Sequence, residues 1–211
     1  MYIAIEGVIG VGKTTLARLL QPAFNAEILL EIFEENPFLS DFYGDRERYA
    51  FQTQIFFLLS RYHQQHRKIP QILAQNETLL SDYTFAKDGL FARINLSGDE
   101  LDMYERVHEA LAEKIRHPDL LVFLRAETQT LMDRIAMRDR PYERDMDSGY
   151  IAALGETYAE FFSKPYNNTP VLTIDTDDLD FVRNPEDLTF IREKIEEALA
   201  QAPPQPKLLD Q

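Results

Sequence analysis

The sequence has no cysteine and no long hydrophobic run. A chain of 211 residues without Cys cannot build a disulfide framework or a thiolate site. This composition fits a reducing compartment, and we expect a cytoplasmic protein. No apolar stretch approaches the roughly 18 residues that a membrane-spanning helix needs. The N-terminus leads directly into a strand-like segment, so neither a transmembrane helix nor a signal peptide is predicted.

Positive charge is also scarce. The chain has 22 Lys and Arg against 36 Asp and Glu, which gives a net charge of −14. Such a surface repels nucleic acid and anionic membranes, so we expect neither as a partner. A local basic pocket for one nucleotide is still compatible with this balance. The hydrophobic fraction of 45% argues for a folded globule, and the length for one domain.

Short apolar segments alternate with longer segments of helical spacing. This alternation predicts an α/β fold with a five-stranded, mostly parallel sheet flanked by helices. In such sheets functional groups collect at the carboxyl ends of the strands. The predicted strands are residues 2–5, 28–30, 78–81, 120–124 and 171–174. The predicted helices are residues 13–24, 48–67, 99–115, 128–138, 149–162 and 185–200. We expect a single domain over residues 1–200 and a loose, Pro-rich tail over 201–211.

A phosphate-binding loop follows the first strand. The stretch from Gly7 to Thr14 fits the pattern G-x-x-x-x-G-K-[ST], and it lies between a strand and a helix as that pattern requires. Lys13 is expected to reach the β- and γ-phosphates of a nucleoside triphosphate, and Thr14 to ligate magnesium. The predicted ATP-binding residues are Gly7, Val8, Ile9, Gly10, Val11, Gly12, Lys13, Thr14 and Thr15.

Two carboxylates follow the next two strands. Glu31 comes directly after the second strand, where it could take a proton from an attacking hydroxyl group. The alternative is a carboxylate that only solvates a loop. Asp82 ends the third strand, the usual place for a magnesium-associated acid in phosphate-loop proteins. Its alternative role is a helix N-cap.

The predicted helix 48–67 carries polar residues within an apolar stripe. Gln54 and Arg61 are seven residues apart, so they share one helix face. Buried polar groups need partners, and the edge of a nucleobase would supply them. The alternatives are an internal hydrogen-bonded pair or an exposed face.

An arginine cluster follows the fourth strand, in the stretch "RIAMRDRPYER" that contains Arg134, Arg138, Arg140 and Arg144. Guanidinium groups match phosphate oxygens and can neutralise a transferring phosphoryl group. Pro141 indicates that the helix ends here. We therefore predict a short arginine-rich lid over about residues 134–147. The alternative is a solvated, salt-bridged face.

Together these motifs resemble the deoxynucleoside kinase family, in its bacterial branch of deoxyadenosine, deoxyguanosine and deoxycytidine kinases. The likeness runs from Tyr2 to about Val182. It rests on the phosphate loop, on the glutamate after the second strand, and on a lid of the form R-x-x-x-R-x-R followed by acids. It also rests on the ungapped spacing of Tyr43, Tyr49, Gln54 and Arg61.

The resemblance implies a P-loop kinase fold, ATP with Mg²⁺, and a homodimer. It implies transfer of the γ-phosphate of ATP to the 5′-hydroxyl of a purine deoxynucleoside or deoxycytidine, for nucleotide salvage. Deoxyadenosine is the first candidate and deoxyguanosine the second. The implied roles are Glu31 as general base, Tyr43 and Glu143 at the 3′-hydroxyl, Gln54, Arg61 and Asp88 at the base, Arg134, Arg138 and Arg140 with Lys13 at the phosphates, and Thr14 and Asp82 at the metal.

The sequence departs from the family pattern after the third strand. Many relatives have an acid-Arg-Ser triplet, whereas this chain has Asp82, Tyr83 and Thr84. Because Tyr83 carries no charge, the missing contact must come from elsewhere, for which a lid arginine is one candidate. Gln52 is a rival to Gln54, and we favour Gln54 because Arg61 then keeps its spacing.

Two other nucleotide-binding classes are weighed against this interpretation. A nucleoside monophosphate kinase, such as a thymidylate kinase, needs an arginine near the second strand to hold the acceptor phosphate. The chain has "EIFEEN" there, and three acids would repel that phosphate. A regulatory nucleotide switch needs a guanine-reading N/T-K-x-D motif, which the sequence lacks.

Overall fold

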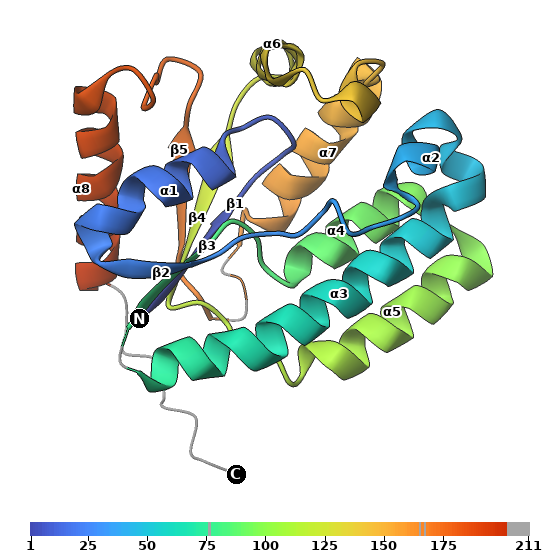
Figure 1. Cartoon of the computed structure of the whole chain (residues 1–211), viewed down its shortest axis with the longest axis horizontal. Coiled ribbons are helices and arrows are strands. Elements are labelled where there is room, and N and C mark those ends of the chain that lie inside the picture. The colour runs from blue at the N-terminus through green and yellow to red at the C-terminus, as the bar shows by residue number, and fades with distance from the viewer. Residues whose placement is uncertain (76, 165, 167, 202–211) are drawn as a thin grey trace.

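A single parallel sheet forms the centre of the molecule (Figure 1). The computed structural model describes residues 1–75, 77–164, 166 and 168–201. The strands are β1 (Tyr2–Glu6), β2 (Ala26–Leu29), β3 (Thr78–Ser81), β4 (Leu120–Arg125) and β5 (Val171–Asp175). Their order is β2-β3-β1-β4-β5, and all neighbouring pairs are parallel. The predicted five-stranded α/β fold is thereby confirmed.

Helices cover both faces of this sheet. Helices α1 and α8 lie on one side in Figure 1, while α3, α4, α5 and α7 lie on the other. The helices are α1 (Lys13–Phe24), α2 (Leu39–Gly44), α3 (Arg46–Ala74), α4 (Ala86–Asn95), α5 (Gly98–Ala112), α6 (Thr128–Arg138), α7 (Ser148–Phe161) and α8 (Pro185–Gln201), with a 3₁₀ helix over Pro141–Glu143. Strands β1 and β4 are almost completely buried, as expected for central strands of a sheet covered on both faces.

Several boundaries differ from those predicted. Helix α3 begins before Arg48 and continues through Pro70 to Ala74. This is tolerated because Pro70 is exposed and lies near the end of the helix, where few backbone bonds are lost. Helices α2 and α4 were not predicted at all. Gln201, expected in the tail, is the last residue of α8, and the rest of the predicted tail lies outside the described residues.

No helix in the described part of the chain is long and apolar enough to cross a membrane.

Candidate active site

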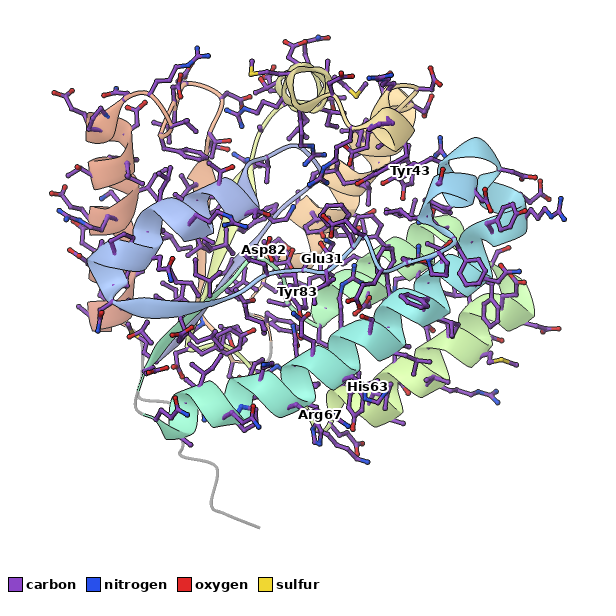
Figure 2. All side chains as sticks on the ribbon, in the orientation of Figure 1. Glu31, Tyr43, His63, Arg67, Asp82 and Tyr83 are labelled. Atoms are coloured by element: carbon purple, nitrogen blue, oxygen red, sulfur yellow. The ribbon has the colours of Figure 1, made fainter. Side chains whose placement is uncertain are left out.

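A cavity of about 870 Å³ opens at the carboxyl ends of the strands. Figure 2 shows Glu31, Asp82 and Tyr83 close together near the middle of the molecule, with Tyr43 nearer to α2. Most of the predicted site residues line this cavity: Ile9, Gly10, Val11, Gly12, Lys13, Thr14, Thr15, Glu31, Tyr43, Gln54, Arg61, Asp82, Arg134, Arg138, Arg140 and Glu143. Gly7, Val8 and Asp88 do not line it. The fold therefore brings together side chains from seven separate segments of the predicted site.

The phosphate loop has the backbone that only glycine adopts easily. Gly10 and Gly12 have φ values of 90° and 102°, in the region that side chains disfavour. A Cβ atom at Gly12 would also lie 2.9 Å from the ring of Phe181. Lys13 folds back over the loop, where its Nζ donates to the carbonyls of Gly7 at 2.7 Å and Val8 at 3.0 Å.

The charge of Lys13 is sensitive to its surroundings. Burial lowers the pKa of Lys13 to about 8, and the nearby ammonium of Lys87 acts in the same direction. The carboxylates of Glu6 and Glu31 oppose this shift. A bound polyanion would also raise the pKa of Lys13, because it favours the charged form of the lysine.

Asp82 connects the phosphate loop to Glu31. Its Oδ2 accepts a short hydrogen bond from the Thr14 hydroxyl, and its Oδ1 accepts from the backbone N–H of Glu31 at 2.8 Å. Asp82 is not a helix N-cap, since α4 begins at Ala86. Its carboxylate and the Thr14 hydroxyl form an oxygen-only donor pair, the kind that hard cations prefer.

Glu31 is held by two cations and does not solvate a loop. Its Oε1 accepts from Arg61, with the Nε at 3.1 Å and a shorter contact to Nη2. Its Oε2 accepts from the Nζ of Lys87. Burial by itself raises the pKa of Glu31, but Lys87 and Arg61 outweigh it and hold that pKa well below the usual range. Glu31 is therefore ionised at neutral pH.

Arg61 also pairs with Asp88, which is buried and does not line the cavity. Its Nη1 donates to Asp88 Oδ1, while Asp88 Oδ2 is buried without a hydrogen-bond partner among the described residues. Gln54 is 2% exposed and lines the same cavity, whereas Gln52 is exposed. Gln54, and not Gln52, thus lines the cavity together with Arg61.

Lys87 is among the cavity residues that sequence reasoning missed, as are Asp133, Asp180 and Arg183. Lys87 lies in the first turn of α4, is 7% exposed, and lines the cavity. Tyr83, by contrast, is completely buried. Its hydroxyl donates to Gln64 Oε1, and its ring packs with Tyr2, Ala4, Leu29, Ile69 and Leu79. The sequence signal for Lys87 was its position next to Asp88, but no helix was predicted there.

The lid arginines have partners inside the protein. Arg138 donates to Glu143 Oε2 from Nε at 3.1 Å and from Nη2 at 2.5 Å. Arg140 lies 3.5 Å from Glu143 Oε1, and its guanidinium stacks 4.0 Å above the ring of Phe33. Arg134 donates to the carbonyl of Thr176 at 2.6 Å. These arginines therefore make internal contacts within and next to the segment predicted as a lid.

The lid also contacts the opposite wall through aromatic rings. Tyr142 stacks on Tyr43 with a centroid distance of 5.9 Å. Tyr43 and Glu143 both line the cavity, and Glu143 is 4% exposed. The two residues thus approach the cavity from α2 and from the 3₁₀ helix, although no hydrogen bond joins them among the contacts described here.

Comparison with known proteins agrees with this geometry. The family model described as deoxynucleoside kinase matches residues 3–200. A deoxyguanosine kinase of Bacillus subtilis (strain 168) is 34% identical over 201 residues, which cover 94% of this chain and 97% of that protein. A deoxyadenosine kinase of Dictyostelium discoideum is 36% identical over 178 residues, which cover 82% of this chain and 71% of that protein.

A solved structure is similar over nearly the whole fold. The structure of deoxyadenosine kinase from M. mycoides with bound dCTP superposes with a TM-score of 0.79 at 26% identity, and the match covers 93% of this chain and 100% of that one. The family match spans most of the chain, which decides against a monophosphate kinase and a regulatory switch. The protein belongs to the deoxynucleoside kinase family and is an ATP-dependent phosphotransferase.

Proposed function

We propose that this kinase transfers the γ-phosphoryl group of ATP to the 5′-hydroxyl of deoxyadenosine in preference to other deoxynucleosides, with deoxyguanosine second and deoxycytidine a further candidate. Relatives of similar identity act on different bases by name, a deoxyguanosine kinase at 34% and a deoxyadenosine kinase at 36%. Base preference is therefore argued from the cavity itself and not from the relatives.

The observation that carries this proposal is the unpartnered carboxylate oxygen of Asp88. Oδ2 is buried and lacks a hydrogen-bond partner among the described residues, and leaving a buried acceptor unpaired costs about 1–3 kcal/mol. Asp88 does not line the cavity, so in this proposal Arg61 shifts when the base binds and Oδ2 becomes accessible. The exocyclic amino group of adenine or cytosine then donates to it, whereas thymine presents a carbonyl oxygen there. Guanine also presents a carbonyl oxygen, but the free N–H groups of Arg61 could donate to its O6 and N7.

Glu31 acts as the general base in this proposal. A bond forms between the 5′ oxygen and the γ-phosphorus, the bond from that phosphorus to the β–γ bridging oxygen breaks, ADP leaves, and the hydroxyl proton passes to Glu31. Oε1 accepts from both Nε and Nη2 of Arg61, whereas Oε2 accepts from Lys87 and has a second lone pair for the proton. A strongly basic group is not required, because such transfers depend mainly on positioning and charge stabilisation.

The remaining predicted residues bind and orient the two substrates. Tyr43 and Glu143 hold the 3′-hydroxyl, and their side chains fill the space next to C2′. Lys13 binds the β- and γ-phosphates. Arg134, Arg138 and Arg140 exchange part of their internal contacts for phosphate oxygens when the lid, about residues 134–147, closes and excludes water.

Magnesium fits the oxygen ligands near the phosphate loop. Within the described part of the chain, no three His, Cys, Asp or Glu side chains are grouped so that they could hold a metal ion by themselves. This agrees with Mg²⁺, which usually takes one or two protein ligands and keeps waters and substrate phosphates for the rest. Thr14 and Asp82 would hold it. When bound, the ion neutralises charge on the β- and γ-phosphates.

The proposal is tested by measuring kcat/KM with ATP for deoxyadenosine, deoxyguanosine, deoxycytidine and thymidine. We expect deoxyadenosine to be highest and thymidine lowest by at least about 10²-fold, the usual effect of an unmatched buried polar group. Thymidine as the best substrate would contradict it. The single domain over residues 1–200, the homodimer and the cytoplasmic location stay predictions, to be checked by limited proteolysis, light scattering and cell fractionation.

A further inference from the structure

We propose that Lys87 takes part in the phosphoryl transfer: its ammonium group fixes Oε2 of Glu31 and contacts an oxygen of the transferred phosphoryl group. This inference rests on the proposed role of Glu31 as general base. Lys87 comes from the first turn of α4, across the cavity from the phosphate loop. It is neither part of the loop nor part of the lid.

The two oxygens of Glu31 are divided between two cations. Arg61 takes Oε1, and the Nζ of Lys87 takes Oε2 in an ion pair whose partners are 8% and 12% exposed. Because each oxygen is fixed by a different element, the carboxylate cannot rotate without breaking one pair. Lys87 thus determines which lone pair of Oε2 points toward the attacking hydroxyl.

A purely structural lysine would not be expected at this position. Lys87 and Lys13 line the same cavity. Two ammonium groups at one cavity oppose folding unless anions compensate them. The carboxylate of Glu31 supplies part of that compensation through its ion pair with Lys87. The phosphates of a bound nucleotide would supply more.

Tyr83 and the lid arginines do not supply the positive charge that Lys87 places beside Glu31. Tyr83 is uncharged, and its hydroxyl donates to Gln64 Oε1. Arg138 and Arg140 pair with Glu143, and Arg134 binds Thr176. Lys87 is therefore a cation already in place beside Glu31 before any lid movement.

The experiment compares Lys87→Met with the wild-type enzyme. Methionine keeps most of the side-chain volume and removes the charge. We expect kcat to fall at least about tenfold, while KM for the deoxynucleoside changes less than about threefold, because the lost interaction acts on the reacting groups and not on the base. Arg93→Met is the matched control: Arg93 lies on the same helix but its side chain is 60% exposed, and we expect unchanged kinetics.

A conservative variant separates this role from structural support. Lys87→Arg keeps a cation in the first turn of α4, where Lys87 pairs with Glu31 Oε2. We expect it to recover at least about threefold of the kcat that Lys87→Met loses.

Each outcome decides the proposal. A kcat within threefold of wild type for Lys87→Met, or a Lys87→Arg variant as slow as Lys87→Met, overturns it, as does a kcat loss explained by a lower melting temperature. Glu31→Gln is measured alongside. If that variant stays active, the proposed role of Glu31 fails as well; if only that variant is inactive, the role of Lys87 alone is wrong.

Discussion

Glu31 and Asp88 share one guanidinium group. Arg61 donates to both carboxylates, and its Cζ atom lies 4.5 Å from the centroid of the Phe57 ring. In the proposed function the first carboxylate takes the hydroxyl proton and the second reads the base. A base that moves Asp88 would therefore move Arg61 and disturb Glu31, which links substrate choice to the chemical step.

Replacing Glu31 with Gln should lower kcat by at least about 10²-fold, the lower range of general-base contributions. The amide keeps the size of the side chain but cannot accept the hydroxyl proton. Steady-state kinetics with deoxyadenosine and ATP measure the effect. Glu35→Gln is the matched control, because Glu35 is exposed on the same loop; a loss of kcat in both variants would count against the base role.

Replacing Asp88 with Asn should lower kcat/KM for deoxyadenosine more than for deoxyguanosine. The amide can present an N–H where Asp88 Oδ2 now presents an acceptor, so it clashes with an amino group and suits a carbonyl oxygen. The expected change in the ratio of the two kcat/KM values is about 10–100-fold, or about 1–3 kcal/mol. An equal loss with both substrates would show that Asp88 only supports Arg61.

Replacing Tyr83 with Phe should affect stability and not catalysis. The variant loses the hydroxyl that donates to Gln64 and leaves a part-buried acceptor unpaired. We expect a loss of about 1–2 kcal/mol in the free energy of unfolding, measured by chemical denaturation. Because the Tyr83 ring lies outside the cavity, kcat should stay within twofold of the wild-type value. A larger drop would show that Tyr83 contributes to the reaction.

ATP binding should weaken above pH 8 and take up protons there. The pKa of Lys13 is lowered to about 8, so the lysine loses its charge as the pH rises through that value. Bound phosphates favour the charged form, so ATP binding draws a proton onto Lys13. We expect KM for ATP to rise by up to about tenfold per pH unit.

Calorimetric titrations at pH 8.5 in buffers of different ionisation enthalpy count the protons directly. Lys13→Arg is the control, because arginine stays protonated throughout this range. Binding heats that do not depend on the buffer would contradict the lowered pKa.

The sheet could be predicted from the sequence because its signals are local. The apolar runs at β1, β3 and β4 are buried on both faces, and the glycine loop between β1 and α1 has its own spacing. Gln54 and Arg61 could also be placed, since seven residues on a helix return to the same face. Local rules were therefore sufficient to predict the phosphate loop, Glu31, Asp82 and the helix face that carries Gln54 and Arg61.

Lys87 could not be predicted, because its role depends on how α4 packs. Residues Ala86, Lys87, Asp88, Leu90 and Ala92 are all buried, so charged and apolar residues are buried together and the sequence shows no amphipathic period. The pairing of Lys87 with Glu31 spans 56 residues and arises only when α4 lies across from the end of β2. The internal contacts of the lid arginines likewise depend on where Glu143 and Thr176 are placed.

The strand order divides the molecule into two halves with separate tasks. Arg61, Lys87 and Asp88 come from helices that follow β2 and β3 in the chain, whereas Arg134, Thr176 and Phe181 come from segments that follow β4 and β5; β1 lies between the two pairs of strands. Under the proposed function the first half reads the base and the second binds the phosphates of the donor, while Glu143 of the second half contacts the 3′-hydroxyl and Lys87 of the first half contacts the transferred group. Mutations in one half can therefore change base preference without altering donor use. Related enzymes could thus differ in their nucleoside substrate while they keep the same phosphate donor.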